Sequence, residues 1–140
     1  MIELQVQTDY RCKPIKGVFM EEYMLSDSEL LIMKIIWKSN QSLSLQEIME
    51  RLNKEWSPKT VSVFLGRIVK KNLLVSQRKG KQFYYTPTTT EEEYMKKEVT
   101  KCVDSLSDGQ ADVFLAALVG ARGLTDKEKE KIRGLLDELE

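Results

Sequence analysis

The chain has 140 residues, 41% of them hydrophobic and 31% charged, and its 22 basic side chains balance 22 acidic ones. This composition is typical of one or two small globular domains; without a membrane-spanning run or the apolar core of a signal peptide, we expect a cytoplasmic location. Two cysteines and no histidine exclude His-based acid–base catalysis, Cys–His nucleophilic pairs and nearly every zinc site, so we expect no enzyme, metal or cofactor.

The charges are unevenly distributed along the chain. Residues 56–90 contain no carboxylate and seven basic side chains: Lys59, Arg67, Lys70, Lys71, Arg78, Lys79 and Lys81. The segments before and after this stretch carry more acidic than basic side chains. Residues 56–90 therefore create a local positive field that the zero net charge hides.

Residues 1–24 are expected to form an N-terminal arm. Ile2, Leu4 and Val6 alternate as in a strand before Pro14 breaks the pattern, so the arm is either flexible or an added edge strand. It can also be an extension that is not native to the protein. The sequence neither requires nor excludes a disulfide between Cys12 and Cys102.

Two capping boxes predict the first two helices after this arm. Ser26 is followed by Glu29, and Ser44 by Glu47, which is the Ser-x-x-Glu spacing that begins many helices. The predicted buried sides are Leu30, Met33, Ile36 and Trp37 in the first helix, and Leu45, Ile48, Met49 and Leu52 in the second.

A third helix is expected in the stretch from Trp56 to Leu74. Ser57 is its predicted N-cap, and Pro58 takes the first helical position, where its missing N–H matters little. The predicted buried side consists of Val61, Phe64, Leu65, Ile68 and Asn72. Because only a few residues join it to the second helix, the arrangement indicates a helix-turn-helix.

The sequence then changes to the period of strands. Residues 75–87 predict two strands around a tight Arg78–Lys81 turn, in which Gly80 supplies a positive φ. Tyr84 and Tyr85 alternate in the second strand, so one of them is expected to pack inward. Three helices followed by a hairpin form a winged helix, and we assign residues 25–90 to such a domain.

Residues 91–140 return to a helical period and predict three short amphipathic helices, the last one begun by Thr125 and Glu128. Such helices bury little by themselves and are expected to complete a core with a second copy of the chain. Cys102 is interpreted as a buried thiol. The predicted dimer interface consists of Met95, Val99, Cys102, Val103, Leu106, Val113, Phe114, Leu118, Ile132, Leu135, Leu136 and Leu139.

The third helix and the hairpin carry the candidate binding residues. One helix face is small and free of carboxylates, as a close approach to a groove requires, and a basic hairpin tip follows it. Lysine and arginine that neutralise phosphates release counterions, and residues near the start of a recognition helix reach base edges. The predicted DNA-binding residues are Ser57, Lys59, Thr60, Ser62, Val63, Arg67, Lys70, Arg78, Lys79 and Lys81.

Five stretches resemble the penicillinase repressor family, the BlaI/MecI/CopY type: LSDSELLIMKIIW, LQEIMERLN, WSPKTVSVFLGRIVKKNLL, FYYTP and LTDKEKEKIRGLLDELE. The resemblance runs from about Leu25 to the C-terminus. It implies a homodimeric winged-helix repressor that binds inverted repeats through its N-terminal domain and dimerises through its C-terminal helices. A membrane-bound sensor protease, or copper in one branch, is the partner that it implies.

The sequence departs from the pattern of that family at three places. Val61-Ser62-Val63 replaces an Ile-Arg-Thr run, so the operator is expected to differ from TACA/TGTA-type half-sites. Ala117 and Leu118 stand at the positions that match an Asn-Phe cleavage site, which puts inactivation by that proteolysis in doubt. The chain ends in LLDELE rather than in paired cysteines, which excludes metal sensing by that route.

The sequence therefore predicts a mostly α protein with a small β-hairpin: a winged helix-turn-helix DNA-binding domain plus a C-terminal three-helix dimerisation region. Its predicted function is repression of transcription from a palindromic double-stranded operator. The alternative is a winged helix that serves as a protein-interaction module, which salt dependence would distinguish because only DNA binding weakens strongly with salt. A third hypothesis is a repressor released by oxidation of Cys102.

Overall fold

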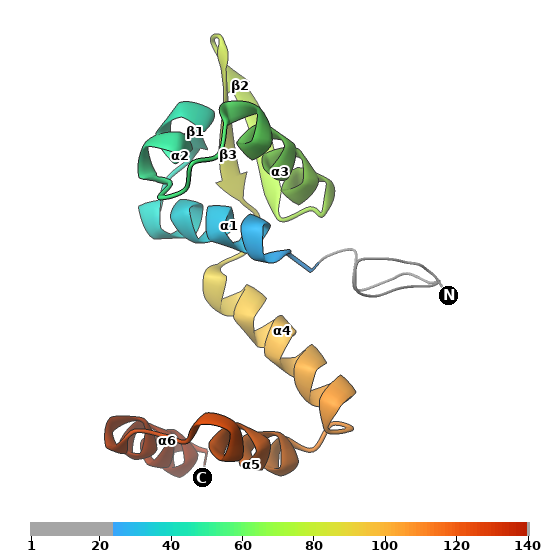
Figure 1. The fold of residues 1–140 in the computed structure, drawn as a ribbon, viewed down its shortest axis with the longest axis vertical. Coiled ribbons are helices and arrows are strands. Elements are labelled where there is room, and N and C mark those ends of the chain that lie inside the picture. Colours follow the sequence, from blue (N-terminus) through green and yellow to red (C-terminus); the bar gives the residue numbers. More distant parts are fainter. Residues whose placement is uncertain (1–23, 140) are drawn as a thin grey trace. The chain divides into compact units, whose positions relative to one another are not determined.

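The computed structural model describes residues 24–139, in which six helices and a three-stranded sheet form. Figure 1 shows them in chain order as α1 (Asp27–Ser39), β1 (Leu43–Ser44), α2 (Leu45–Arg51), α3 (Pro58–Lys70), β2 (Leu74–Lys79), β3 (Gln82–Pro87), α4 (Glu91–Leu106), α5 (Ala111–Arg122) and α6 (Asp126–Glu138). The predictions for the N-terminal arm and Cys12 lie outside the described residues. The chain divides into two compact units, the first ending at Met95 and the second beginning at Lys96.

The predicted starts of α1 and α2 are confirmed. The Ser26 hydroxyl accepts the N–H of Glu29 at 3.2 Å, and the Glu29 carboxylate accepts the N–H of Ser26 at 3.1 Å. Ser44 and Glu47 repeat the arrangement at 3.2 and 2.9 Å. Each box satisfies two backbone donors that a helix start otherwise leaves without a partner, which fixes where α1 and α2 begin.

The prediction that one helix extends to Leu74 is wrong. α3 ends at Lys70, and Asn72 takes a left-handed conformation with φ of 65°. Asparagine tolerates that conformation because its short polar side chain bonds locally, and it interrupts the helical path. Asn72 is exposed rather than on the buried side, and its carbonyl accepts the Thr88 hydroxyl at 2.7 Å. Leu74 belongs to β2.

The sheet has the order β1-β3-β2 with antiparallel pairs. β2 and β3 are joined by Gly80 and Lys81, and Gly80 has φ of 67°, which confirms the predicted hairpin and the role of its glycine. Figure 1 shows this hairpin rising beyond the three helices of its unit. β1, only two residues long, was not predicted, because it is too short to show a strand period and exists through its pairing with β3.

The core of the first unit lies between α1, α2, α3 and the base of the sheet. The helical spacing of Val61, Leu65 and Ile68 places these side chains in the core, as predicted, while Phe64 is half-buried against Trp56 with ring centres 5.2 Å apart. The buried apolar residues are Ile32, Met33, Ile36, Trp37, Leu43, Ile48, Val61, Leu65, Ile68, Leu74 and Tyr94. This packing leaves the opposite side of α3 outside the core.

The start of α4 packs into the first unit through Tyr94. Its hydroxyl accepts the N–H of Leu25 at 3.0 Å, and its ring lies 5.7 Å from that of Trp37, whose indole N–H donates to the Thr89 carbonyl at 2.9 Å. Trp37 is thus buried, as expected. These contacts explain why the first compact unit continues past the hairpin to Met95.

The second unit consists of the rest of α4 with α5 and α6, and the capping box predicted for α6 is confirmed: Thr125 and Glu128 exchange hydrogen bonds of 3.0 and 3.1 Å. Arg122, near the end of α5, adds an ion pair of 2.7 Å to Glu128. The hydrogen bond from Arg122, together with that from the Thr125 backbone, lowers the pKa of Glu128 to about 2. This pair connects the end of α5 to the start of α6.

The Glu128 pair should make the second unit sensitive to acid. Because the folded pKa of about 2 lies below the ordinary value of 4.5, the carboxylate stabilises the fold above pH 4.5, and that contribution is lost as the pH falls towards 2. We expect the difference in melting temperature between the native chain and Glu128→Gln to shrink over this window. Circular dichroism from pH 7 to 2 measures it, and a difference that stays constant would contradict the assignment.

Candidate nucleic-acid interface

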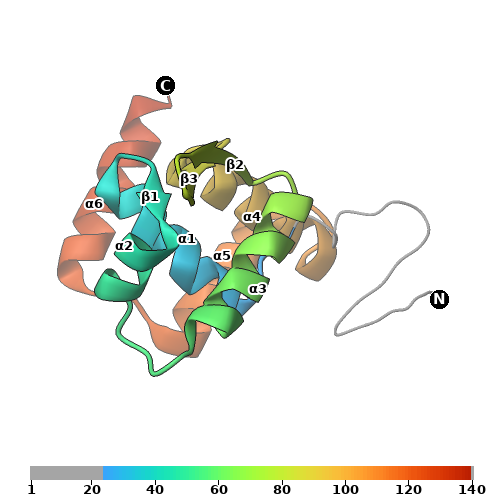
Figure 2. The same cartoon turned by 90° about the horizontal axis from the view of Figure 1, so that it is seen from above.

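The side of α3 that faces away from the core carries small and basic side chains. Figure 2 shows α1 and α2 lying on one side of α3 only. Val63 is 46% exposed, and no carboxylate occurs on the helix. The exposed residues are Lys59, Ser62, Val63, Gly66, Arg67 and Lys70, and we call them the α3 face. Their short central side chains allow a close approach to a groove, while the longer cations can reach beyond it.

The N-terminus of α3 is ordered by two of the residues predicted to contact DNA. The Ser57 hydroxyl accepts the N–H of Thr60 at 3.1 Å and lies 3.0 Å from the Thr60 hydroxyl. Pro58 has no N–H, so the N–H of Lys59 is the donor of the first turn that lacks an acceptor among the described residues. A free donor at a helix start, with the helix dipole behind it, suits a phosphate oxygen.

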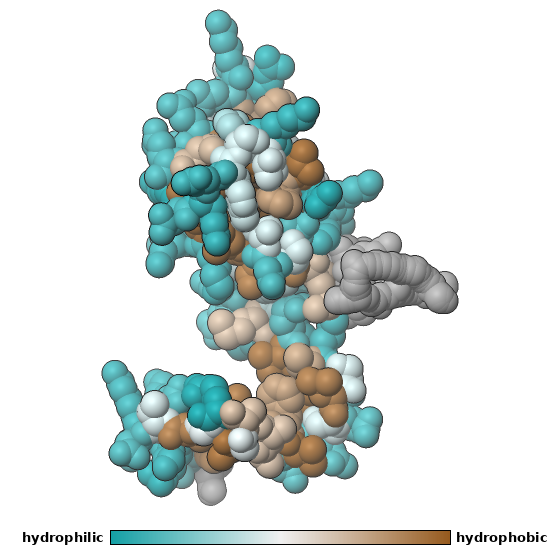
Figure 3. Space-filling model, viewed as in Figure 1, coloured by the Kyte–Doolittle hydropathy of each residue, from teal (hydrophilic) through white to brown (hydrophobic). Residues whose placement is uncertain are grey.

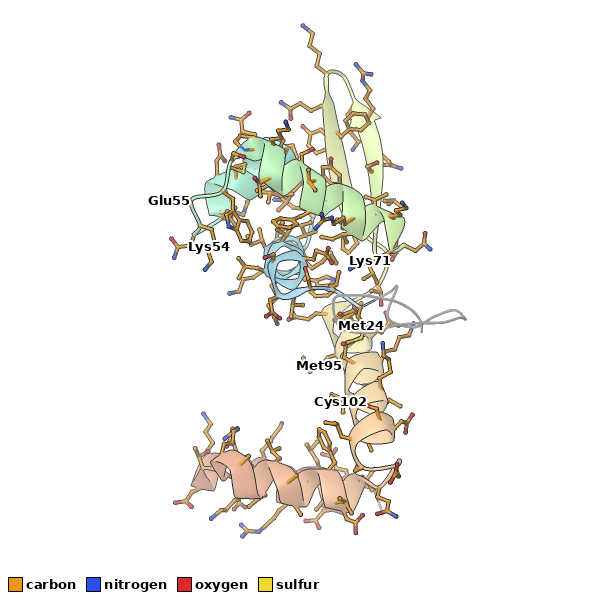
Figure 4. The ribbon with its side chains drawn as sticks, turned by 45° about the vertical axis from the view of Figure 1, so that its right-hand side comes forward. Met24, Lys54, Glu55, Lys71, Met95 and Cys102 are labelled. Carbon is orange, nitrogen blue, oxygen red and sulfur yellow. The ribbon has the colours of Figure 1, made fainter. Side chains whose placement is uncertain are left out.

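Lys71 does not belong to the exposed positive surface, although it lies in the carboxylate-free stretch of the sequence. Its ammonium pairs with the Glu29 carboxylate at 2.5 Å and donates to the Met24 carbonyl at 2.7 Å. Figure 4 shows Lys71 beside Met24, with Lys54 and Glu55 at the opposite end of α3. The other six cations of the stretch form no ion pair with residues 24–139, so their charges remain available to an anion.

The hairpin β2–β3, which we call the wing, adds three exposed cations: Arg78, Lys79 and Lys81. The Arg78 guanidinium carbon lies 5.9 Å from the centre of the Phe83 ring, and the Lys79 ammonium lies 5.6 Å from that of Tyr84. Phe83 is not among the residues predicted from the sequence, although it belongs to the aromatic run Phe83–Tyr85 of the second strand.

Tyr85, the neighbour of Tyr84, packs against the core, which confirms that one of the two tyrosines points inward. Its partial burial raises the pKa of the Tyr85 hydroxyl above the ordinary value of 10.0. Because it packs against the core, Tyr85 supports the base of the wing rather than its surface.

The apolar stripes of the C-terminal helices are exposed in the single chain. Figure 3 shows hydrophobic side chains gathered on the surface of α4 and α5. The largest exposed fractions among the predicted interface residues are those of Leu139 (82%) and Leu106 (75%). Leu115 and Val119, which are not among the predicted interface residues, are exposed on α5 as well, because that helix is apolar around most of its circumference. The exposed residues of the predicted interface are Met95, Val99, Cys102, Leu106, Val113, Leu118, Leu135, Leu136 and Leu139, while Val103, Phe114 and Ile132 are half-buried.

Two predictions concern residues of the second unit. The interpretation of Cys102 as a buried thiol is wrong for the single chain, in which Cys102 is exposed. Ala117 and Leu118 lie in the middle of α5, so the peptide bond between them is in a regular helix.

Among residues 24–139 no group of three or more His, Cys, Asp or Glu side chains could hold a metal ion, and no helix is long and apolar enough to cross a membrane.

Comparison with known proteins gives the family of the chain. The sequence model of the penicillinase repressor family matches residues 25–138. The chain belongs to this family. This penicillinase repressor family member is 30% identical to the penicillinase repressor of Bacillus licheniformis. The 116 aligned residues cover 81% of this chain and 90% of the relative.

A second relative of this family member is the methicillin resistance regulatory protein MecI of Staphylococcus aureus (strain N315). It is 26% identical over 116 residues, which cover 82% of this chain and 94% of the relative. Among solved structures, the DNA-binding domain of the repressor BlaI is 40% identical, with a TM-score of 0.46, and covers 50% of this chain and 87% of that one.

If the α3 face binds phosphate, Lys70→Ala should change the salt dependence of DNA binding by this family member. The slope of log affinity against log salt concentration should become shallower by about 1, because one fewer counterion is released. Titrations of a fluorescent duplex at several salt concentrations measure the slope. Lys38→Ala, which removes an exposed cation from α1, is the matched control and should leave it unchanged. Equal slopes for the native chain and Lys70→Ala would contradict a phosphate contact.

Proposed function

We propose that the protein is a transcriptional repressor that binds an inverted-repeat operator as a homodimer and blocks polymerase sterically. The observation that carries the proposal is the α3 face, whose cations no carboxylate of the described chain neutralises. Membership in a family described as penicillinase repressors supports it. In this arrangement α3 enters the major groove as the recognition helix of a helix-turn-helix.

Each part of the α3 face has a role in this proposal. Lys59, at the helix start, reaches a guanine edge or a phosphate, and Ser62 offers both a donor and an acceptor. Val63 provides an apolar contact for a thymine methyl group. Arg67 and Lys70 lie further along the helix and contact phosphates, while Arg78, Lys79 and Lys81 of the wing hold the flanking backbone. Ser57 and Thr60 act by ordering the helix start.

The exposed apolar side chains of the C-terminal helices support the proposed homodimer. Soluble monomers rarely expose large contiguous apolar patches, and a second copy of the same helices offers a matching surface. Two copies would then present two α3 helices to the two halves of an inverted repeat. Cys102, which is exposed in the single chain, would be covered in that dimer as a residue of the predicted interface.

Release of the operator by a sensor protease would require a local change in α5. Proteases bind their substrates as extended chains, and the bond between Ala117 and Leu118 lies within a helix. Cleavage there therefore needs α5 to unwind at least locally. The sensor protease remains part of the proposal as the partner that the family resemblance implies.

The test of the function is selection of bound sequences from a random duplex pool by the full chain at near-physiological salt. An enriched inverted repeat supports a dimeric sequence-specific repressor, and comparison of its half-site with TACA/TGTA shows whether Ser62 and Val63 change the readout. If no sequence is enriched, specific operator binding is refuted. Binding of partner proteins that is insensitive to salt would then favour the interaction-module alternative.

A further inference from the structure

The wing carries an exposed aromatic side chain whose position the core does not explain. Phe83 is 49% exposed, whereas Tyr85, two residues along β3, packs against the core. Side chains two residues apart on a strand point to the same side of the sheet. The face that covers the core at Tyr85 therefore continues past it at Phe83, in the part of the hairpin that rises beyond the helices (Figure 1).

Phe83 lies against the guanidinium of Arg78. The two residues pair directly across β2 and β3, and the guanidinium carbon lies 5.9 Å from the centre of the ring. The Nε–H of Arg78 donates to the Gly80 carbonyl at 3.1 Å. The ring and the carbonyl thus hold the guanidinium from two sides, while its two terminal nitrogens have no acceptor among residues 24–139.

Lys79 has an equivalent support on the other face of the wing. Its ammonium lies 5.6 Å from the centre of the Tyr84 ring. Because neighbouring residues on a strand point to opposite faces, Arg78 and Lys79 leave the hairpin on opposite sides. The wing therefore presents one cation, supported by an aromatic ring, on each of its faces.

We propose that Phe83 is a positioning residue for DNA binding, whose ring holds Arg78 ready to contact the phosphates beside the half-site of α3. The inference rests on the proposed operator binding. Arginine is a flexible side chain, and ordering it only at the moment of contact weakens binding through lost rotamer entropy. A ring that already holds the guanidinium reduces that loss and leaves the terminal nitrogens free for phosphate oxygens.

The experiment is a double-mutant cycle with the full chain on the duplex obtained by selection. Phe83→Leu, Arg78→Ala and the double variant are titrated beside the native chain at one near-physiological salt concentration. Phe83→Leu should weaken binding about two- to fivefold, the affinity equivalent of an exposed cation–π contact. In the Arg78→Ala background the same change should have no effect, because the ring no longer has a guanidinium to hold.

Two controls separate positioning from folding. Phe83→Tyr keeps the aromatic face and should retain native affinity, and Val75→Ala, which shortens another exposed apolar side chain of the wing, should do the same. In the free protein, the NMR signal of the Arg78 Nε–H should move when Phe83→Leu removes the ring. If that signal stays unchanged, the ring does not hold the guanidinium, and the proposal is overturned without any DNA.

The outcomes also separate this inference from the proposed function. A native chain that binds no selected duplex refutes both. If the native chain binds and Phe83→Leu weakens binding equally with and without Arg78, the ring acts by itself and the positioning role is wrong. If Phe83→Leu binds the duplex as tightly as the native chain does, the positioning role of Phe83 is refuted, while operator binding itself stands.

Discussion

A chain that ends after Met95 should fold but bind an inverted-repeat operator about 10²- to 10⁴-fold more weakly than the full chain. The first compact unit ends at Met95, so this truncation keeps Tyr94 and its contacts with Leu25 and Trp37. It removes nearly all of the exposed apolar stripes. Without a linked partner, the second half-site has to be bound independently, and the gain from a high effective concentration is lost.

The truncation is measured by titrating duplexes that carry one or two half-sites. The full chain should favour the inverted repeat strongly, whereas the truncated chain should bind both duplexes with similar affinity. In the full chain, Leu136→Asp with Leu139→Asp is the matched control: it should reproduce the loss without shortening the protein. Full affinity of the truncated chain for the inverted repeat would refute the role of the C-terminal helices.

The position of the cut matters for the stability of the first unit. A chain that ends after Thr90 lacks Tyr94, a residue that is 9% exposed and whose ring contacts that of Trp37. We expect this shorter chain to be less stable by about 2 kcal/mol or more than the one that ends after Met95, since it loses a buried aromatic side chain. Urea unfolding of the two truncated chains measures the difference.

Glu29→Ala should destabilise the protein by about 2–3 kcal/mol, more than the loss of a helix cap alone explains. The Glu29 side chain is 3% exposed and accepts from Ser26 and from Lys71. Its removal therefore opens the capping box of α1 and leaves the Lys71 ammonium without its counter-charge. Because Lys71 is itself 23% exposed, water replaces part of the lost interaction and keeps the effect below that of a fully buried pair.

Glu47→Ala is the matched control for that substitution. Glu47 occupies the same position in the capping box of α2, and no lysine or arginine pairs with its carboxylate among the described residues. Glu47→Ala should lower the free energy of unfolding by about 1 kcal/mol. Urea unfolding compares the two variants, and equal losses would show that the Lys71 pair adds nothing. Adding Lys71→Ala to Glu29→Ala should recover part of the stability, since no unpaired cation remains.

Some features of the fold depend on residues close together in the sequence, and these were predictable. The capping boxes at Ser26, Ser44 and Thr125 act over three residues, so their spacing alone fixed the starts of three helices. The positive φ at Gly80 is equally local. The end of α3 was predicted wrongly although its cause is also local: Asn72 was placed by the helical period of its neighbours, whereas its left-handed backbone ends the helix.

The charge of the candidate interface shows the limit of reading a sequence segment. All seven cations of residues 56–90 counted toward the predicted positive field, but Lys71 is paired with Glu29, which lies 42 residues away in the sequence. No prediction from the sequence covered Phe83, whereas the register of β2 and β3 places it against Arg78. Neither pairing is encoded in a local period.

By itself, the sequence determined the order of the helices, the winged-helix class and the basic character of α3 and the wing. These depend on backbone capping, side-chain period and composition, which act over a few residues. The tertiary structure decided that β1 joins the sheet, that Tyr94 extends the first unit to Met95 and that Lys71 forms an ion pair with Glu29. These features arise only when chain segments far apart in sequence meet, because pairing, burial and ion-pair geometry are properties of the folded contact rather than of either segment.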